Sequence, residues 1–419
     1  MSHLLYLAGR SAWNRRLTLG LTLIAIALSV TLLLGVERVR HDARESFAQS
    51  VSGTDLVIGA RTSPVQLMLY SVFRIGEATN NVKWESFQHL AAHPLVAWAI
   101  PLSLGDSHRG YSVVGTSTAY FDHFRYSGEQ TLTFSAGTRF ANLFEAVVGA
   151  EVAERLKYRA GDRIVLNHGA SDIGAEHADK PFTVVGILAR TGTPVDRSVH
   201  VPLEAIEAIH LDWQGGAPMP GVAIPAEYVR KFDLTPKNIT AALIGLKSRA
   251  AVFRMQRYSN EYEGEPLMAV LPGVALDQLW QVVGIAERVL LAVSGMVVAV
   301  GLAGLVAVVL ASLNERRREL AILRSVGARP REIFLLLMIE AVGITLAGAV
   351  AGVILLAILT ATLAPVAAAR YGLIIEQRYV ASGELVLLGA VVAMGVLASL
   401  LPGYRAYKLS LADGLTPRL

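Results

Sequence analysis

Four long stretches without a charged residue constrain the fold more than any other feature of this sequence. They lie at residues 17–36, 289–314, 341–369 and 385–404. A helix needs about 20 mainly apolar residues to cross the hydrocarbon core of a bilayer, where a buried charge is costly. Every stretch meets that length, and a content of 53% hydrophobic and only 17% charged residues agrees with it. We therefore predict four transmembrane helices, and four buried helices of a soluble protein are the less favoured interpretation.

Short basic segments beside these stretches predict their orientation. Residues 1–16 carry three arginines and no acid, the segment 314–332 carries six arginines, and the tail 405–419 carries three further basic residues. Lysine and arginine next to a membrane span are retained on the cytoplasmic side. Both termini and residues 314–332 are therefore expected in the cytoplasm, and residues 37–288 outside.

The predicted fold class is a membrane α-helical protein with a large mixed α/β extracytoplasmic domain between spans 1 and 2. In chain order the predicted segments are a cytoplasmic N-terminus (1–16), transmembrane helix 1 (17–36), the external domain with helical stalks (37–288), transmembrane helix 2 (289–313), a cytoplasmic coupling helix and loop (314–332), transmembrane helix 3 (333–365), a short external loop (366–384), transmembrane helix 4 (385–404) and a cytoplasmic tail (405–419).

Short apolar runs closed by glycine alternate with helical patterns inside the external segment, which is long enough to bury cores of its own. Strands are predicted at Tyr111–Gly115, Ala146–Gly149 and Phe182–Leu188, and helices at Trp84–Leu90, Ala150–Leu156 and Pro202–Ile209. The stretches 167–181 and 214–225 have the glycine, proline and polar content of loops.

Several classes of function are excluded by what the sequence lacks. Without a single cysteine, the chain can form no disulfide, thiol nucleophile or cysteine-ligated metal site. It contains no GxxxxGK[ST] motif to cradle phosphates and no GxSxG nucleophile elbow. The net charge of +4 comes from arginines beside the spans, without interleaved aromatic residues, so no nucleic-acid partner is expected. We predict a non-catalytic membrane subunit that binds no cofactor directly.

The segment Glu315–Ala328 has the sequence ERRRELAILRSVGA. Leu320, Leu323 and Val326 recur at helical spacing, so one face can lie on the membrane or in a partner's cleft while the charged side chains face elsewhere. Gly327 is suited to end this helix, and Pro330 is suited to begin the next one. The alternative is that the arginines only enforce the topology.

Residues 318–328, directly after the second apolar stretch, resemble the REIAILKxxGA signature of the MacB/FtsX/LolC permeases, which belong to the type VII ABC transporters. The order of one span, a large external domain and three spans is also that of this family. Residues 113–121, 147–153, 160–162 and 182–188 resemble its periplasmic core domain. The tail 402–415 is similar to the family's closing motif, although Leu411 stands where proline is usual.

The resemblance implies a permease subunit in the bacterial inner membrane that works as a homodimer with two copies of a separate ABC ATP-binding subunit. That partner would use ATP and Mg²⁺, and the permease would pass its motion to the external domain. The cargo would be a lipoprotein, a lipid, a small molecule or a metal-linked substrate, with a periplasmic adaptor or binding protein as a further partner. The alternative is an FtsX-like scaffold that regulates a hydrolase and transports nothing. The expected ATPase-coupling residues are Glu315, Arg316, Arg317, Arg318, Glu319, Leu320, Leu323, Arg324, Gly327 and Ala328.

Three weaker patterns point to further contacts. Gly348 and Gly352 form a GxxxG pattern, which suits the close approach of a helix from a second copy. His168 and His177 lie in one polar loop and can bind a transition metal, although a solvated loop explains them as well. His89 and His93 share a helix face, which is weak evidence for a metal site.

Overall fold

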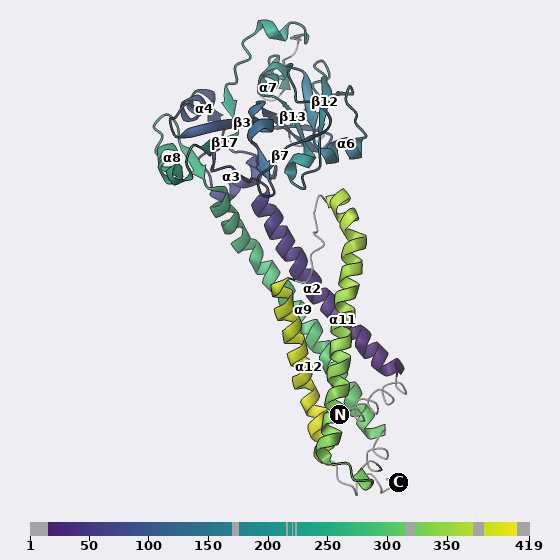
Figure 1. Ribbon diagram of the computed structural model, residues 1–419. Helices are drawn as coiled ribbons and strands as arrows, with labels where there is room; N and C mark the ends of the chain where they lie inside the picture. The colour runs from purple at the N-terminus through teal and green to yellow at the C-terminus, as the bar shows by residue number, and fades with distance from the viewer. Residues whose placement is uncertain are drawn as a thin grey trace. The chain divides into compact units, whose positions relative to one another are not determined.

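The computed structural model describes residues 16–169, 176–214, 217–219, 221–222, 224–315, 322, 324–371 and 381–408 (Figure 1). The chain divides into two compact units. One, here called the membrane unit, comprises Met1–Asp42, Gly284–Val366 and Ile375–Leu419, and the other, the external domain, comprises Ala43–Val283 with Ala367–Ile374.

Four helices of the described residues are long and apolar enough to cross a membrane, which confirms the predicted set. They are α2 (Arg16–Gln49), α9 (Pro272–Glu315), α11 (Pro330–Tyr371) and α12 (Ser382–Lys408). Helix α2 continues beyond its candidate span, which ends at Asp42, and α9 begins before its candidate span, which starts at Gly284. Helix α11 continues to Tyr371, and its candidate membrane-spanning part is Pro330–Ala364.

The helices of the membrane unit bury one stripe of side chains and leave the rest apolar but uncovered. Val30, Leu305 and Leu337 are at most 1% exposed in the shared core, whereas Leu21 and Val300 are 70% and 72% exposed. A helix that is hydrophobic on all sides suits a surrounding of lipid rather than water. The guanidinium of Arg38 on α2 donates to both carboxylate oxygens of Glu384 on α12 at 2.9 and 3.0 Å.

A mixed sheet of 12 strands forms the frame of the external domain in the described residues. Its main path runs β10-β12-β9-β13-β5-β3-β17-β1-β18; off this path, β4 pairs with β5, β11 pairs with β4, and β8 pairs with β12. The strands are β1 (Leu56–Ala60), β3 (Val96–Ser103), β4 (Asp106–His108), β5 (Tyr111–Thr116), β8 (Phe134–Gly137), β9 (Glu145–Val148), β10 (Arg163–Ile164), β11 (Asn167–His168), β12 (Phe182–Leu188), β13 (Ser198–Pro202), β17 (Ala241–Leu246) and β18 (Leu267–Val270).

Short helices pack on this sheet and complete three hydrophobic cores. They are α3 (Pro64–Ser71), α4 (Trp84–Ala91), α5 (Ala119–His123), α6 (Ala150–Leu156), α7 (Leu203–Ile209) and α8 (Val252–Asn260). Strand β12 alternates buried and half-buried positions, and every residue of β13 is buried, as expected for a central strand covered on both faces. The three predicted strands and three predicted helices are confirmed as β5, β9, β12, α4, α6 and α7.

His200 lies fully buried in β13, with its ring 4.9 Å from the ring of Tyr120. Burial, together with the nearby Arg74 guanidinium, lowers the pKa of His200 to about 3. The unfolded chain binds a proton at this position below about pH 6.5, and the folded chain does so only below about 3. The unfolded state therefore gains protons first, and the stability of the external domain should fall as the pH drops through this interval.

We predict that His200→Phe makes the stability of the external domain less dependent on pH between 6.5 and 3. The wild-type protein should lose up to about 3 kcal/mol through this residue on going from pH 7 to pH 4. The measurement is denaturant unfolding of the purified protein followed by tryptophan fluorescence at a series of pH values. The control is His89→Phe at an exposed position on α4, and equal slopes for the two variants would contradict the assignment.

Candidate functional site

Four side chains that can each offer one metal-ligand atom converge in the external domain. Asp106 comes from β4, His168 from β11, His177 from the segment that follows, and His210 from the end of α7. Their ligand atoms all lie within 4.8 Å of one another. We call these four residues the His/Asp cluster.

Strand pairing brings the first two residues of the cluster together. Strands β4 and β11 are antiparallel, and their register places His168 opposite Asp106 and Asn167 opposite Ser107. Residues directly opposite in a ladder present their side chains on the same face of the sheet. Accordingly, His168 Nδ1 lies 3.2 Å from Asp106 Oδ1, and this hydrogen bond raises the pKa of His168.

The end of α7 sets the orientation of His210. Its Nδ1 lies 2.7 Å from the carbonyl oxygen of Ile206, one of the helix-terminal carbonyls without a partner inside the helix. A carbonyl only accepts, so Nδ1 carries the hydrogen and Nε2 of the neutral ring keeps its lone pair. That Nε2 lies 3.0 Å from His168 Nδ1 and 3.6 Å from Asp106 Oδ1.

His177 is fully buried, and neither of its ring nitrogens has a hydrogen-bond partner among the described residues. Its ring centroid lies 4.1 Å from that of Trp213. Burial lowers the pKa of His177 to about 4, so the ring is neutral at pH 7. A buried imidazole without a partner is costly, and such a group in a native structure calls for an explanation.

A buried ion pair anchors the segment that carries His177. The ammonium of Lys180 is fully buried and lies 2.9 Å from both carboxylate oxygens of Asp212 and 2.5 Å from Asp179. Burial raises the pKa of Asp212, but the hydrogen bonds from Lys180 and from the Ile224 amide outweigh it and hold the pKa below its ordinary value. The two carboxylates balance the lysine charge and fix the chain on either side of the cluster.

Of the predicted metal ligands, both His168 and His177 belong to the His/Asp cluster. Sequence reasoning missed Asp106 and His210, because only the strand register and the end of α7 bring these distant positions together. His89 and His93 do not belong to the cluster: His93 Nδ1 instead accepts a hydrogen bond from the Leu95 amide at 3.3 Å. The one sequence signal for His210 is its position directly after Ile209, the predicted last residue of a helix.

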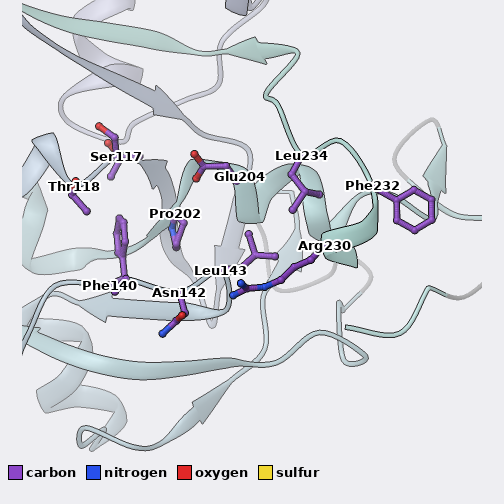
Figure 2. Close-up of a pocket in the computed structure, with 12 residues that line it drawn as sticks. Ser117, Thr118, Phe140, Asn142, Leu143, Pro202, Glu204, Arg230, Phe232 and Leu234 are labelled. Carbon is purple, nitrogen blue, oxygen red and sulfur yellow. The ribbon is translucent and has the colours of Figure 1, made fainter. Parts of the chain in front are cut away.

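An open hollow of about 530 Å³ lies elsewhere on the external domain. Figure 2 draws the side chains that line it. Apolar side chains such as Phe140 and Leu143 line it together with the charged Glu204 and Arg230. None of the predicted site residues lines the hollow. Helix α7 nevertheless connects the two places, because Glu204 in its first turn lines the hollow and His210, next to its last residue, belongs to the cluster.

The predicted coupling segment lies only partly within the described residues. The positions of Arg316, Arg317, Arg318, Glu319, Leu320 and Leu323 fall outside them, and Glu315 is the last residue of α9. Gly327 has φ of +106°, a conformation that glycine adopts readily and that ends a helical segment. Helix α11 then begins at Pro330, while the Arg329 amide donates to the Glu332 carboxylate at 2.9 Å. The predicted helix end and restart are confirmed.

Gly348 and Gly352 do allow a close helix approach, but the partner is α2 of the same chain. A Cβ atom at Gly348 would lie 2.7 Å from Ile26 Cγ2, and one at Gly352 would lie 2.7 Å from the backbone oxygen of Ala27. The threonine hydroxyl of Thr31 also donates to the Gly352 carbonyl at 3.0 Å. We therefore correct the assignment of these glycines to a contact between copies: a GxxxG pattern indicates closeness but does not say which helix is close.

We predict that Gly352→Val lowers the stability of the membrane unit by about 1–3 kcal/mol, since the side chain would be forced against the α2 backbone. Gly343→Val, on the same helix, should have little effect because nothing lies within 4 Å of a Cβ placed there. The measurement is the thermal unfolding midpoint of each purified variant in detergent. Equal midpoints for the two variants would show that α2 and α11 do not pack this closely.

Two family models match the chain. The MacB-like periplasmic core domain matches residues 19–243, and the FtsX-like permease C-terminal model matches residues 291–411. Between them the matches take in the first apolar helix, most of the external domain and the last three apolar helices.

Curated proteins with similar sequences include the pyoverdine export ATP-binding/permease protein PvdT of Pseudomonas entomophila (strain L48), with 25% identity over 99% of this chain and 60% of the relative. The macrolide export ATP-binding/permease protein MacB of Azoarcus sp. (strain BH72) is 25% identical over 80% of this chain and 48% of the relative. The chain thus spans about half to three-fifths of the length of these relatives. Among solved structures, the periplasmic region of MacB from Actinobacillus actinomycetemcomitans aligns with a TM-score of 0.34 and 11% identity, over 56% of this chain and 94% of that one.

Proposed function

Because the chain belongs to the family of permeases with a MacB-like periplasmic core domain, we propose that it is the permease subunit of an ABC transporter complex. In this role it passes ATP-driven motion across the membrane to its external domain. The observation that carries the proposal is the match of two permease models to 19–243 and 291–411, around a set of four apolar helices. The family match and the lengths of the four apolar helices together support the role of a permease subunit, whereas either observation alone fits several other roles.

The proposed location is the bacterial inner membrane, with both termini in the cytoplasm and the external domain in the periplasm. The arginines of residues 1–16 and 314–332 support this orientation, since basic residues next to spans stay in the cytoplasm. The coupling segment 315–328 then faces the ATPase, and the turn at Gly327 leads from it into α11.

ATP hydrolysis is assigned to a separate ATP-binding subunit, present in two copies with two copies of the permease. The names of the curated relatives combine ATP binding and permease activity, while the 419 residues here contain no phosphate-cradling motif. ATP and Mg²⁺ therefore belong to the partner in this proposal.

Transport is favoured over the FtsX-like scaffold function. The similar curated proteins are named for the export of pyoverdine and of macrolides, which supports a small molecule as the first class of cargo to test. Lipids, lipoproteins and metal-linked substrates are the other classes, and a periplasmic adaptor or binding protein is the further partner proposed.

We predict that Arg317→Glu combined with Glu319→Arg reduces ATP turnover of the purified complex by about tenfold or more. Tenfold corresponds to about 1.4 kcal/mol, the size of one lost charge-assisted contact. The complex is isolated from native membranes through a C-terminal tag, its subunits are identified by mass spectrometry, and its vanadate-sensitive ATPase activity is measured. The control exchanges the exposed ion pair of Arg139 and Asp122, as Arg139→Asp with Asp122→Arg, and should leave turnover unchanged.

Two results would count against the proposal. If no ATP-binding subunit accompanies the intact permease, the ABC assignment fails. If the subunit is present but the coupling exchange inserts normally and turns over ATP at the wild-type rate, the role of residues 315–328 fails while the family assignment stands.

A further inference from the structure

We propose that the external domain binds one divalent transition-metal ion of the Zn²⁺ class at Asp106, His168, His177 and His210. This inference does not depend on the transport role, because it rests on the geometry and chemistry of the His/Asp cluster alone. No feature of the permease family described above requires such a site.

The first argument is geometric. Asp106 Oδ1, His168 Nδ1 and His210 Nε2 form a triangle with sides of 3.2, 3.0 and 3.6 Å. Ligand atoms at about 2.0–2.2 Å from a tetrahedral Zn²⁺ ion are separated by about 3.3–3.6 Å. Three ligand atoms are therefore already spaced as three corners of a zinc tetrahedron. A fourth ligand atom, from His177, lies within 4.8 Å of those of the other three residues.

The second argument is the state of His177. The imidazole is fully buried, and within the part of the chain that the structure describes neither of its nitrogens has gained a partner in place of water. Coordination of an ion by one of these nitrogens would remove this cost. The ring already lies against the other cluster histidines, with its centroid 4.8 Å from that of His210 and 6.4 Å from that of His168.

The donor set selects the class of ion. Three imidazoles and one carboxylate suit Zn²⁺ and its neighbours in the first transition series, whereas Ca²⁺ and Mg²⁺ prefer oxygen ligands throughout. The hydrogen bond from His210 Nδ1 to the Ile206 carbonyl is the outer contact that metal-binding histidines usually make. The indole of Trp213 covers one side of the cluster and limits the access of water, with its centroid 5.3 Å from that of His168.

Neighbouring charge does not oppose a cation at this place. The ammonium of Lys180 is engaged by Asp179 and Asp212, as described above, so its charge is already balanced. Asp106 is buried and contributes a negative charge directly to the site. A bound ion would join β4, β11, the His177 segment and the end of α7, which also reaches the hollow of Figure 2.

The test is a zinc titration of the purified protein in detergent. The protein is purified through a tag that contains no histidine, and a chelator removes bound metal before the titration. Isothermal titration and competition with a chromogenic zinc chelator should both report one Zn²⁺ per chain and no binding of Mg²⁺. His177→Ala and His168→Ala should each weaken the affinity by at least about a hundredfold, since even outer-shell changes cost about 10–100-fold. The double variant His89→Ala and His93→Ala removes two imidazoles elsewhere in the external domain and should bind as the wild type does.

Two further measurements distinguish a loss of zinc binding from a loss of folding. His168 is the more exposed ligand, with 37% of its side chain accessible, so His168→Ala should keep the wild-type circular dichroism even if His177→Ala unfolds. Cu²⁺ should quench the fluorescence of Trp213, and Trp213→Phe should remove that quenching while Zn²⁺ still binds. Absence of stoichiometric zinc binding by the wild type, or unchanged affinity in folded His168→Ala, would overturn the proposal.

Discussion

The cost of placing a charge in hydrocarbon is the constraint on which the rest of this structure depends. It accounts for four helices whose apolar parts contain few charges and for their lipid-facing leucines and valines. Polar groups that remain between the helices have partners: the Ser29 hydroxyl donates to the Ala25 carbonyl at 2.8 Å, and Arg38 and Glu384 neutralise each other through two hydrogen bonds. The hydrophobic effect contributes little to helix association in lipid. Close packing at small residues stabilises the helix contacts instead, as Gly348 and Gly352 do against α2.

The external domain is surrounded by water, so burial of apolar surface is the main source of its stability. The mixed sheet supports three cores, and its short strands β4 and β11 carry two residues of the His/Asp cluster. Strands β4 and β11 are only three and two residues long, yet their register sets the position of Asp106 and His168. The buried Lys180 and Asp212 then fix the neighbouring segments. Removing one partner of such a pair would leave an uncompensated charge, so the pair constrains where His177 and Trp213 can lie.

Local patterns predicted much of the fold. Charge-free length identified the four long helices. Short apolar runs identified three strands, of which Phe182–Leu188 has the predicted bounds and the other two differ from them by one residue at one end or at both. What the sequence could not predict depends on contacts between distant segments. His168 and His177 were recognisable because they share a loop, but Asp106 joins them only through an antiparallel register. The spacing of Gly348 and Gly352 predicted close packing but not the helix against which they pack.

The connections of the external domain to α2 and α9 both enter at one margin of its sheet. Strand β1 follows α2, β18 precedes α9, and the two pair with Val57 opposite Val270, so the start of one strand meets the end of the other. Strand β10 closes the opposite margin of the nine-strand path. With neighbouring strands about 4.8 Å apart, that margin lies roughly 40 Å from β18 along the sheet. The chain segments that lead to α2 and α9 therefore leave the sheet from two neighbouring strands, so anything that either helix passes to this sheet enters it there.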